Sequence, residues 1–151
     1  MSKVVVADSS CLIGLSKIGK LEILHNLFGT IFIPEKVYHE VVVSGKGRAG
    51  AEEVKHADWI ETHAAQNALA VRAFQLHLGD GESEAISLAA ECNADFLILD
   101  DLKARQVAEE IGLRIVGTVA LLYKSAEKGI LGEDIQVVLE QLRQAGFRFL
   151  L

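Results

Sequence analysis

The sequence predicts an α/β fold in which helices cover both faces of an open, parallel β-sheet, with one domain over residues 1–151. Two observations predict this class. Short continuous apolar runs, such as Val4–Ala7 and Phe96–Leu99, are typical of strands buried on both faces. Segments with apolar residues at helical spacing separate these runs along the chain. Ligands bind such sheets at the carboxyl ends of the strands, and Asp8 and Asp100 directly follow the two runs.

The composition limits the possible functions. Hydrophobic residues make up 50% of the 151 residues and the mean hydropathy is +0.28, which is enough for one sizeable core. The net charge of −6 argues against a broad nucleic-acid-binding surface, but not against a carboxylate pocket that holds a cation. No apolar stretch approaches the ~20 residues of a membrane helix, and the N-terminus lacks a secretory pattern, so we expect a cytoplasmic protein. Cys11 and Cys92 lack metal-binding spacing and are expected to behave as small hydrophobic residues.

Local signals place the strands in order along the chain. The continuous apolar run near the N-terminus is the first, and two later runs precede Pro34 and Asp100. The segment 44–50 holds three glycines and two cations, so we expect a loop there. Residues 147–151 are expected to form a final edge strand or a docked tail. The other strands are expected at 3–7, 31–33, 96–99 and 114–116, and residues 59–62 are expected to form a strand or an extended edge segment.

Helices are expected between these strands. Ser9 and Ser10 can cap the first helix, and Gly19 can end it. Pro34 suits the first turn of the helix after the second strand, and Gly79–Gly81 is expected to form a turn before another helix. The helices are expected at 9–18, 21–27, 34–42, 51–56, 67–77, 82–92, 102–111, 119–128 and 134–144.

Five acidic residues fall where this fold brings chain segments together: Asp8, Glu40, Glu84, Asp100 and Asp101. Carboxylates that converge on one pocket repel each other and are stabilised by a divalent cation. Such an ion, held by carboxylate oxygens, supports phosphodiester hydrolysis. A single acid after a strand is more often a helix cap or a solvated charge. For Glu40 alone the solvated alternative is favoured, and for Asp8 a site and a cap are equally favoured.

Four segments carry a more specific signal. They are Val4–Ser10 (VVVADSS), Ile33–Val41 (IPEKVYHEV), Gly81–Ala89 (GESEAISLA) and Leu97–Arg105 (LILDDLKAR). In their order and spacing they resemble the PIN-domain family, most closely the prokaryotic branch that includes VapC-type toxin nucleases. The resemblance extends from Lys3 to about Leu131.

The resemblance implies a three-layer α/β/α sandwich with a central parallel sheet, and Mg²⁺- or Mn²⁺-dependent endoribonuclease activity. Asp8, Glu40 and Glu84 match the first three acids of the family, and Asp101 or Asp100 matches the fourth. Asp101 is favoured when the acid is counted from the end of the strand. The resemblance thus assigns catalysis to Asp8, Glu40, Glu84 and Asp101, and metal binding to Asp8, Glu84, Asp100 and Asp101.

Other polar residues are candidates for supporting roles. Glu82 is a supporting acid or, equally, a favourable charge at a helix N-terminus. Ser9 is a candidate substrate contact or a helix cap. Lys36 and Arg105 are candidate phosphate contacts, although Arg105 can instead pair with Asp101. Lys103 is a further candidate phosphate contact, as are Lys46 and Arg48, for which a solvated loop position is favoured.

The chain departs from the family pattern at two positions. Many members have Ser or Thr two residues before the fourth acid, where this chain has Leu99 or, for Asp100, Ile98. Many also have Asp at the position of Glu84. These departures motivate an alternative, a catalytically weak PIN-like binding or regulatory module.

Two other parallel-sheet folds are disfavoured by the residues after the first strand. A Rossmann-like nucleotide-binding domain is disfavoured because a carboxylate, Asp8, stands where a phosphate would bind. A receiver-like domain is disfavoured because the acid after the first strand is single. By resemblance, the expected partners are RNA, a small antitoxin protein and a second copy of the chain.

Overall fold

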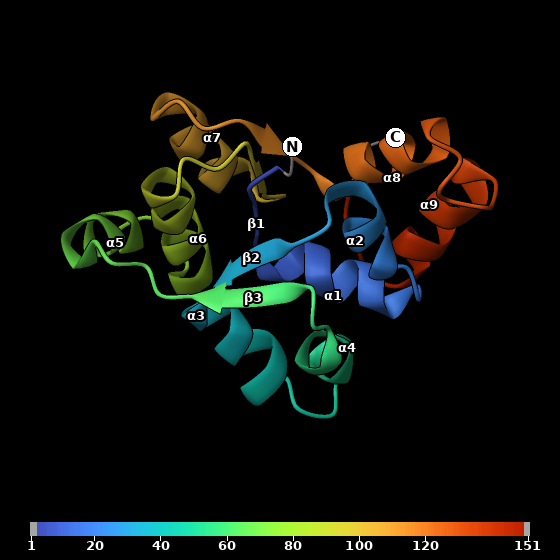
Figure 1. The fold of residues 1–151 in the computed structure, drawn as a ribbon, viewed down its shortest axis with the longest axis horizontal. Coiled ribbons are helices and arrows are strands. Elements are labelled where there is room, and N and C mark those ends of the chain that lie inside the picture. The colour runs from blue at the N-terminus through green and yellow to red at the C-terminus, as the bar shows by residue number, and fades with distance from the viewer. Residues whose placement is uncertain (1–2, 150–151) are drawn as a thin grey trace.

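A five-stranded sheet forms the centre of the computed structural model, which describes residues 3–149 (Figure 1). All neighbouring strands are parallel and their order is β3-β2-β1-β4-β5. The strands are β1 (Val5–Ala7), β2 (Ile31–Pro34), β3 (Ile60–His63), β4 (Phe96–Ile98) and β5 (Ile115–Val116). The predicted open parallel sheet is therefore confirmed.

Helices connect successive strands, as expected for a parallel sheet. They are α1 (Ser9–Lys17), α2 (Glu22–Phe28), α3 (Glu35–Tyr38), the π-helix η1 (His39–Val43), α4 (Ala51–His56), α5 (Ala68–Gln75), α6 (Asp80–Glu91), α7 (Leu102–Glu110), α8 (Thr118–Glu127) and α9 (Ile135–Gln144). No helix within residues 3–149 has the length and apolar character to cross a membrane.

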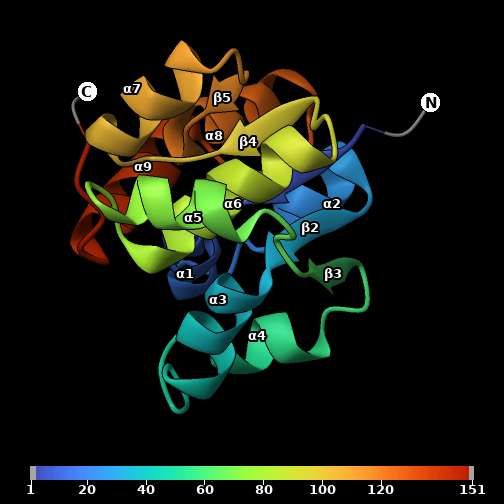
Figure 2. The same ribbon diagram turned by 90° about the vertical axis from the view of Figure 1, so that its left-hand side faces the viewer.

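The sheet separates two apolar clusters, because alternate strand side chains point to opposite faces. Val5, Ala7 and Ile98 pack with residues of α1, α2, α8 and α9, whereas Val6 and Leu97 pack with α6 and α7. Figure 1 shows α8 and α9 on one side of the sheet and α6 and α7 on the other, with α5 outside α6. This arrangement confirms the three-layer α/β/α sandwich. In Figure 2, α3 and α4 project below the edge strand β3.

The register of the sheet aligns the carboxyl ends of β1 and β4. Ala7 pairs with Ile98, and the backbone N–H of Asp8 donates a hydrogen bond of 3.1 Å to the carbonyl of Ile98. The residues that follow these two strands therefore emerge side by side at one edge of the sheet.

The starts of two helices, α3 and α6, differ from the sequence prediction. The expected turn at Gly79–Gly81 is wrong, because Asp80 and Gly81 already form the first turn of α6. Glu82 Oε1 accepts a hydrogen bond of 3.1 Å from the Gly79 N–H, which starts the helix earlier. Pro34 ends β2 in an extended conformation and precedes α3 instead of lying within it.

The C-terminal segment forms the predicted docked tail and not the alternative edge strand. Residues 147–149 have no strand hydrogen bonding, and Phe147 and Phe149 pack against the core. The N–H of Phe147 donates a hydrogen bond of 3.2 Å to the carbonyl of Leu142 in α9. Residues 150 and 151, which were included in this prediction, lie outside the described residues.

Candidate active site

A hollow of about 500 Å³ opens at the carboxyl edge of the sheet. We call it the carboxylate pocket. Its acidic residues come from the ends of β1 and β4, from η1 and from the first turn of α6, so the fold brings together segments that are distant in sequence. The acidic residues that line it are Asp8, Glu40, Asp80, Glu82, Asp100 and Asp101.

Asp8 is the buried acid of this pocket, with only 4% of its surface exposed. Its side chain makes no capping hydrogen bond to α1, and Oδ1 has no hydrogen-bond partner among residues 3–149. Burial raises the pKa of Asp8 from 3.8 to about 7; the Ser9 N–H opposes this shift, and the charges of Glu82, Glu40 and Asp100 add to it. A buried, unpaired carboxylate oxygen is costly, and a bound cation would compensate for that cost.

Glu40 reaches the pocket from η1, and its approach depends on Gly81 in α6. A Cβ atom added at Gly81 would overlap Glu40 Oε1 and would lie 3.5 Å from Asp8 Oδ1. Burial raises the pKa of Glu40, the charge of Lys36 opposes the shift, and neighbouring acids add to it. The absence of a side chain at Gly81 thus lets Glu40 and Asp8 converge from different elements.

Asp100 and Asp101 have different surroundings, although they are adjacent. Asp100 accepts hydrogen bonds from the Thr118 N–H (2.8 Å), the Thr118 hydroxyl (2.7 Å) and the Ser10 hydroxyl (3.2 Å). Asp101 caps α7 by accepting a hydrogen bond of 2.9 Å from the Ala104 N–H. Asp100 is thus oriented by hydrogen bonds from α1 and α8, whereas Asp101 is engaged in capping α7. Thr118 was missed, although a polar residue two positions after the end of β5 was the available signal.

The sequence left two alternatives open for Glu82, an acid of the site and a charge at a helix N-terminus, and its position in the structure is compatible with both. Its Oε1 caps the start of α6 through Gly79, and the side chain also lines the pocket. Burial raises the pKa of Glu82, the hydrogen bond from Gly79 opposes the shift, and the charge of Asp101 adds to it. Asp80 was missed because it was assigned to a turn. Its Oδ2 lies 3.8 Å from Nζ of Lys36.

Glu84 is not among the residues that line the carboxylate pocket. Its Oε1 accepts a hydrogen bond of 3.1 Å from the backbone N–H of Lys36, at the start of α3. The side chain therefore ties α3 to α6 and helps to place Lys36 near Asp80. The sequence did not indicate this contact, because it joins residues 48 positions apart.

Of the three predicted substrate contacts, Ser9 and Arg105 line two different hollows, whereas Lys36 lines neither and lies near Asp80. Ser9 lines the carboxylate pocket. Arg105 lines a neighbouring hollow with Asp100, and no ion pair between Arg105 and Asp101 occurs within residues 3–149. Other predicted cations are not part of the pocket lining: Lys46 and Arg48 are exposed in the loop after η1, and Lys103 is exposed on α7.

The chemical type of the donors, carboxylate oxygen, suits a hard divalent cation. Mg²⁺ and Mn²⁺ prefer carboxylate oxygens, and the pocket combines the unpaired Asp8 Oδ1 with the oriented carboxylate of Asp100. Within residues 3–149, no group of three or more His, Cys, Asp or Glu side chains is placed to hold a metal ion. The pocket is thus open and acidic, and its carboxylates lie near one another without forming a complete coordination shell.

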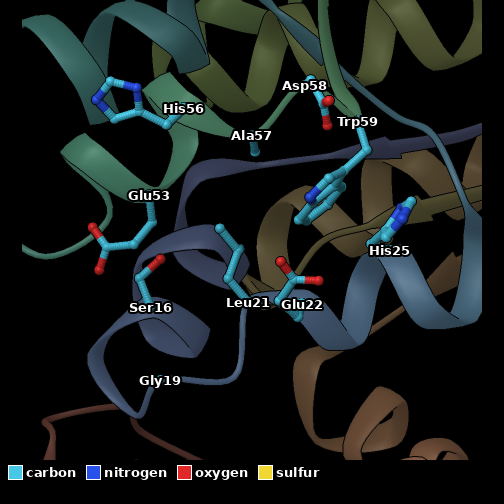
Figure 3. Close-up of a pocket in the computed structure, with 10 residues that line it drawn as sticks. All are labelled: Ser16, Gly19, Leu21, Glu22, His25, Glu53, His56, Ala57, Asp58 and Trp59. Atoms are coloured by element: carbon cyan, nitrogen blue, oxygen red, sulfur yellow. The ribbon is translucent and has the colours of Figure 1, made fainter.

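A second hollow, of about 590 Å³, lies at the opposite, amino edge of the sheet (Figure 3). We call it the amino-edge hollow. Figure 3 shows Ser16 and Glu53 on one side and Trp59 and His25 on the other, with Leu21 between them. The rings of His25 and Trp59 stack with their centroids 5.2 Å apart. None of the acids predicted for the active site lines this hollow.

The fold and the carboxylate pocket together define a class, three-layer α/β/α domains with an acidic site at the carboxyl edge of a parallel sheet. Residues 4–150 match the model of the family DUF3368, described as a PIN domain, and the chain belongs to the PIN-domain family. PIN domains are generally nucleases that act on RNA or DNA, and they generally use divalent metals. No curated protein matches the chain.

Proposed function

We propose that this chain is a metal-dependent endoribonuclease that hydrolyses RNA phosphodiester bonds in the carboxylate pocket. The observation that carries the proposal is the buried carboxylate of Asp8, whose Oδ1 has no partner among the described residues. A folded protein retains such an oxygen at a cost, and binding of a cation at a functional site explains why it is kept.

Some residues of the pocket would hold the metal ion, and others orient those ligands. Asp8 and Asp100 would hold Mg²⁺ or Mn²⁺, with Asp101 and Glu82 beside them. The bound ion would neutralise charge on the phosphoryl oxygens and lower the pKa of a bound water. The hydroxyls of Ser10 and Thr118 keep Asp100 oriented through their hydrogen bonds.

Proton transfer is assigned to Glu40. Burial raises the pKa of Glu40, and a carboxylate with a raised pKa is a stronger base toward the attacking water. Lys36 lies near the acids of α6 and would offer a positive charge to the substrate phosphate. Glu84 would act through the position of α3, since it hydrogen bonds to the backbone of Lys36.

Cleavage of a mixed pool of structured and unstructured RNAs tests the proposal. The wild type and Asp8→Asn are compared with Mg²⁺, with Mn²⁺ and with EDTA. Cleavage that requires both the metal and Asp8 is expected. A folded wild-type protein that cleaves no RNA with either metal, or that cleaves equally well in EDTA, would contradict it. A parallel pool of DNA of the same sequences separates a ribonuclease from a deoxyribonuclease.

A second candidate function is a PIN-like binding or regulatory module with little turnover. Two observations favour it. Leu99, where many members have a hydroxyl, is fully buried, and Glu84 is engaged by the Lys36 backbone outside the pocket. For this candidate, metal would bind and RNA would be retained, but no cleavage products would form.

The biological setting belongs to the same proposal and rests on the family resemblance. A VapC-like toxin role, which is compatible with the family match, implies RNA as the substrate, a small antitoxin as a partner, a homodimer and a cytoplasmic location. Size-exclusion chromatography with light scattering tests the dimer. Growth arrest on expression, relieved in Asp8→Asn, tests the toxin role.

A further inference from the structure

A third hollow, of about 550 Å³, adjoins the carboxylate pocket and shares Asp100, Phe147 and Arg148 with it. We call it the tail hollow. It lies between the first turns of α7 and α8 and residues 147–149 of the C-terminal tail. A strand bound across the carboxylate pocket would therefore continue directly into it.

The chemistry of the wall changes between the two hollows. The carboxylate pocket is lined by six acids, whereas Asp100 is the sole acid that lines the tail hollow among the described residues. The tail hollow is instead lined by the apolar residues Leu102, Val119 and Phe149 and by two arginines, Arg105 and Arg148, of which Arg148 also lines the carboxylate pocket. Apolar and aromatic surface with cations at its margin matches a nucleobase attached to a phosphate.

Interactions within the tail hold its aromatic side chains in place. The Phe147 ring packs over Gly14 in α1, where an added Cβ would lie 2.8 Å from the ring. The centroids of Phe147 and Phe149 are 6.2 Å apart, and the guanidinium of Arg143 lies 5.6 Å from the centroid of Phe149. These contacts give the hollow an ordered aromatic wall.

Arg105 reaches the boundary between the two hollows because Gly117 has no side chain. A Cβ at Gly117 would lie 2.9 Å from Arg105 Nη1 and 3.1 Å from Asp100 Oδ1. The guanidinium is thus placed beside the acid that would help to hold the metal ion. From there it can contact the backbone of a strand that passes from one hollow to the other.

Leu102 gives the hollow an open apolar surface. The Leu102 side chain, at the start of α7, is 77% exposed. Packing in the core therefore does not account for an apolar residue at this position. Such exposed leucines also occur elsewhere on the surface, for example Leu76 at 78%. Leu102 differs because it lies next to two arginines and an aromatic tail.

We propose that the tail hollow binds one unpaired nucleobase of a single-stranded nucleic acid, next to the phosphate that occupies the carboxylate pocket. Phe149 and Leu102 contact the base, and Arg105 and Arg148 contact the adjoining phosphates. A duplex is excluded, because its bases are paired and stacked and their faces are not available. The inference rests on the proposed nuclease function and adds a base-binding subsite to it.

Binding without cleavage tests the subsite. The background is Asp8→Asn, and the probes are a short fluorescent single-stranded RNA, the same DNA sequence and an RNA duplex, followed by anisotropy. Phe149→Ala and Leu102→Ser are each expected to weaken single-strand binding by about tenfold. Phe149→Tyr keeps a stacking face and is expected to retain binding. Leu76→Ser, at a matched exposed leucine, is expected to change nothing.

A set of RNAs, each with one abasic nucleotide, tests the subsite at the level of a single base. One abasic position is expected to weaken binding to the Asp8→Asn background but to have no further effect on Phe149→Ala. The inference is overturned if no position shows this loss. It is also overturned if both Phe149→Ala and Leu102→Ser bind like the background, or if they weaken duplex binding equally. Tighter binding of RNA than DNA would assign the subsite to RNA, and the reverse to DNA.

Failure of the subsite is distinguishable from failure of the nuclease function. If the wild type cleaves RNA and Phe149→Ala cleaves the same bonds with unchanged KM, the nuclease function stands and the subsite is overturned. If the wild type neither cleaves nor binds nucleic acid, both are overturned. Thermal melting of each variant shows whether it is folded. If Phe149→Ala does not fold, Leu102→Ser still tests the subsite, because the exposed Leu102 side chain is not part of the core.

Discussion

The carboxylate pocket and the amino-edge hollow lie at opposite edges of the same sheet and have similar volumes, about 500 and 590 Å³. Both contain acidic residues and one buried side-chain oxygen without a partner among the described residues. In the carboxylate pocket that oxygen belongs to Asp8, whereas in the amino-edge hollow it belongs to the neutral hydroxyl of Ser16. The acids of the amino-edge hollow, such as Glu53 and Asp58, are exposed.

The difference shows that a concave, acidic surface is not enough to indicate a metal site. A charge that remains in water costs little, whereas a buried charge needs a partner. Converging acids raise this cost further at Asp8, because Glu82, Glu40 and Asp100 repel its charge. Burial of the charge, more than the number of acids, distinguishes the two edges.

The largest expected effect is the loss of RNA cleavage in Asp8→Asn, for which Glu53→Gln is the comparison. The first change removes a buried charged ligand with little change in shape, and we expect a loss of about a thousandfold or more. The second change alters an exposed acid of the amino-edge hollow and should leave the rate unchanged. Rates of RNA cleavage in Mg²⁺ measure both. Equal rates for the two variants would remove the distinction between the edges.

The second effect is on stability without metal. The pKa of Asp8 is about 7 in the folded chain against an ordinary 3.8, so between these values the folded state holds a proton that the unfolded state has released. The contribution of Asp8 to the free energy of unfolding is therefore most favourable in acid and falls as the pH rises toward 7, by a few kcal/mol, since one pKa unit corresponds to about 1.4 kcal/mol.

Urea unfolding in EDTA at a series of pH values measures this slope. Asp8→Asn is expected to be less dependent on pH than the wild type, and more stable at neutral pH. A smaller slope of the same sign should remain, because the pKa values of Glu40 and Glu82 are also raised. Wild-type stability that rises with pH over this range would show that the carboxylate of Asp8 is not destabilised by burial.

The third effect concerns the close approach of Glu40 to α6. Gly81→Ala places a Cβ where Glu40 Oε1 lies and should reduce cleavage by about a hundredfold by displacing this acid. Gly79→Ala is the matched control, because a Cβ there meets only Glu82 Oε1, at 3.4 Å. Cleavage kinetics and thermal melting separate displacement from unfolding. A Gly81→Ala variant with normal kinetics would show that Glu40 is not held in place by this contact.

The fourth effect separates two acids to which the resemblance gives similar roles. Glu40→Gln should lower kcat by at least about tenfold, because it removes the assigned proton acceptor. Glu84→Gln keeps an oxygen for the Lys36 N–H and should lower kcat only a few-fold. Single-turnover rates compare the variants. A larger loss of kcat for Glu84→Gln than for Glu40→Gln would indicate that Glu84 takes part in the metal site.

The smallest effect is expected in the amino-edge hollow. Ser16→Ala removes the unpaired hydroxyl, so unfolding in urea should show unchanged or slightly higher stability, by up to about 1 kcal/mol. Cleavage should not change. A marked loss of stability would show that this hydroxyl has a partner, such as a water molecule, and that the two edges are more alike than the contacts indicate.

Much of the fold was predictable because it depends on local patterns. Buried apolar runs such as Phe96–Leu99 identified the strands, and the residues at their carboxyl ends, Asp8 and Asp100, lie at one edge as expected. The start of α6 was not predictable, because the hydrogen bond from Gly79 to Glu82 converts an apparent turn into helix. Capping contacts of this kind override the turn preference of glycine.

The details of the site depended on contacts between distant residues. The sequence favoured Asp101 over Asp100, but the position of Asp100 is set by Thr118, which becomes its neighbour only when β5 joins the sheet. The contact of Glu84 with Lys36 likewise requires the packing of α3 on α6. Counting from the end of a strand could not reveal either partner.

The most direct test of the central claim is calorimetric titration of Mn²⁺ into the wild type, Asp8→Asn and Asp58→Asn at neutral pH. We predict binding by the wild type and by Asp58→Asn, whose substitution lies in the amino-edge hollow, and loss of binding in Asp8→Asn. Binding that survives in Asp8→Asn and is lost in Asp58→Asn would place the metal at the opposite edge of the sheet. That result would contradict the account.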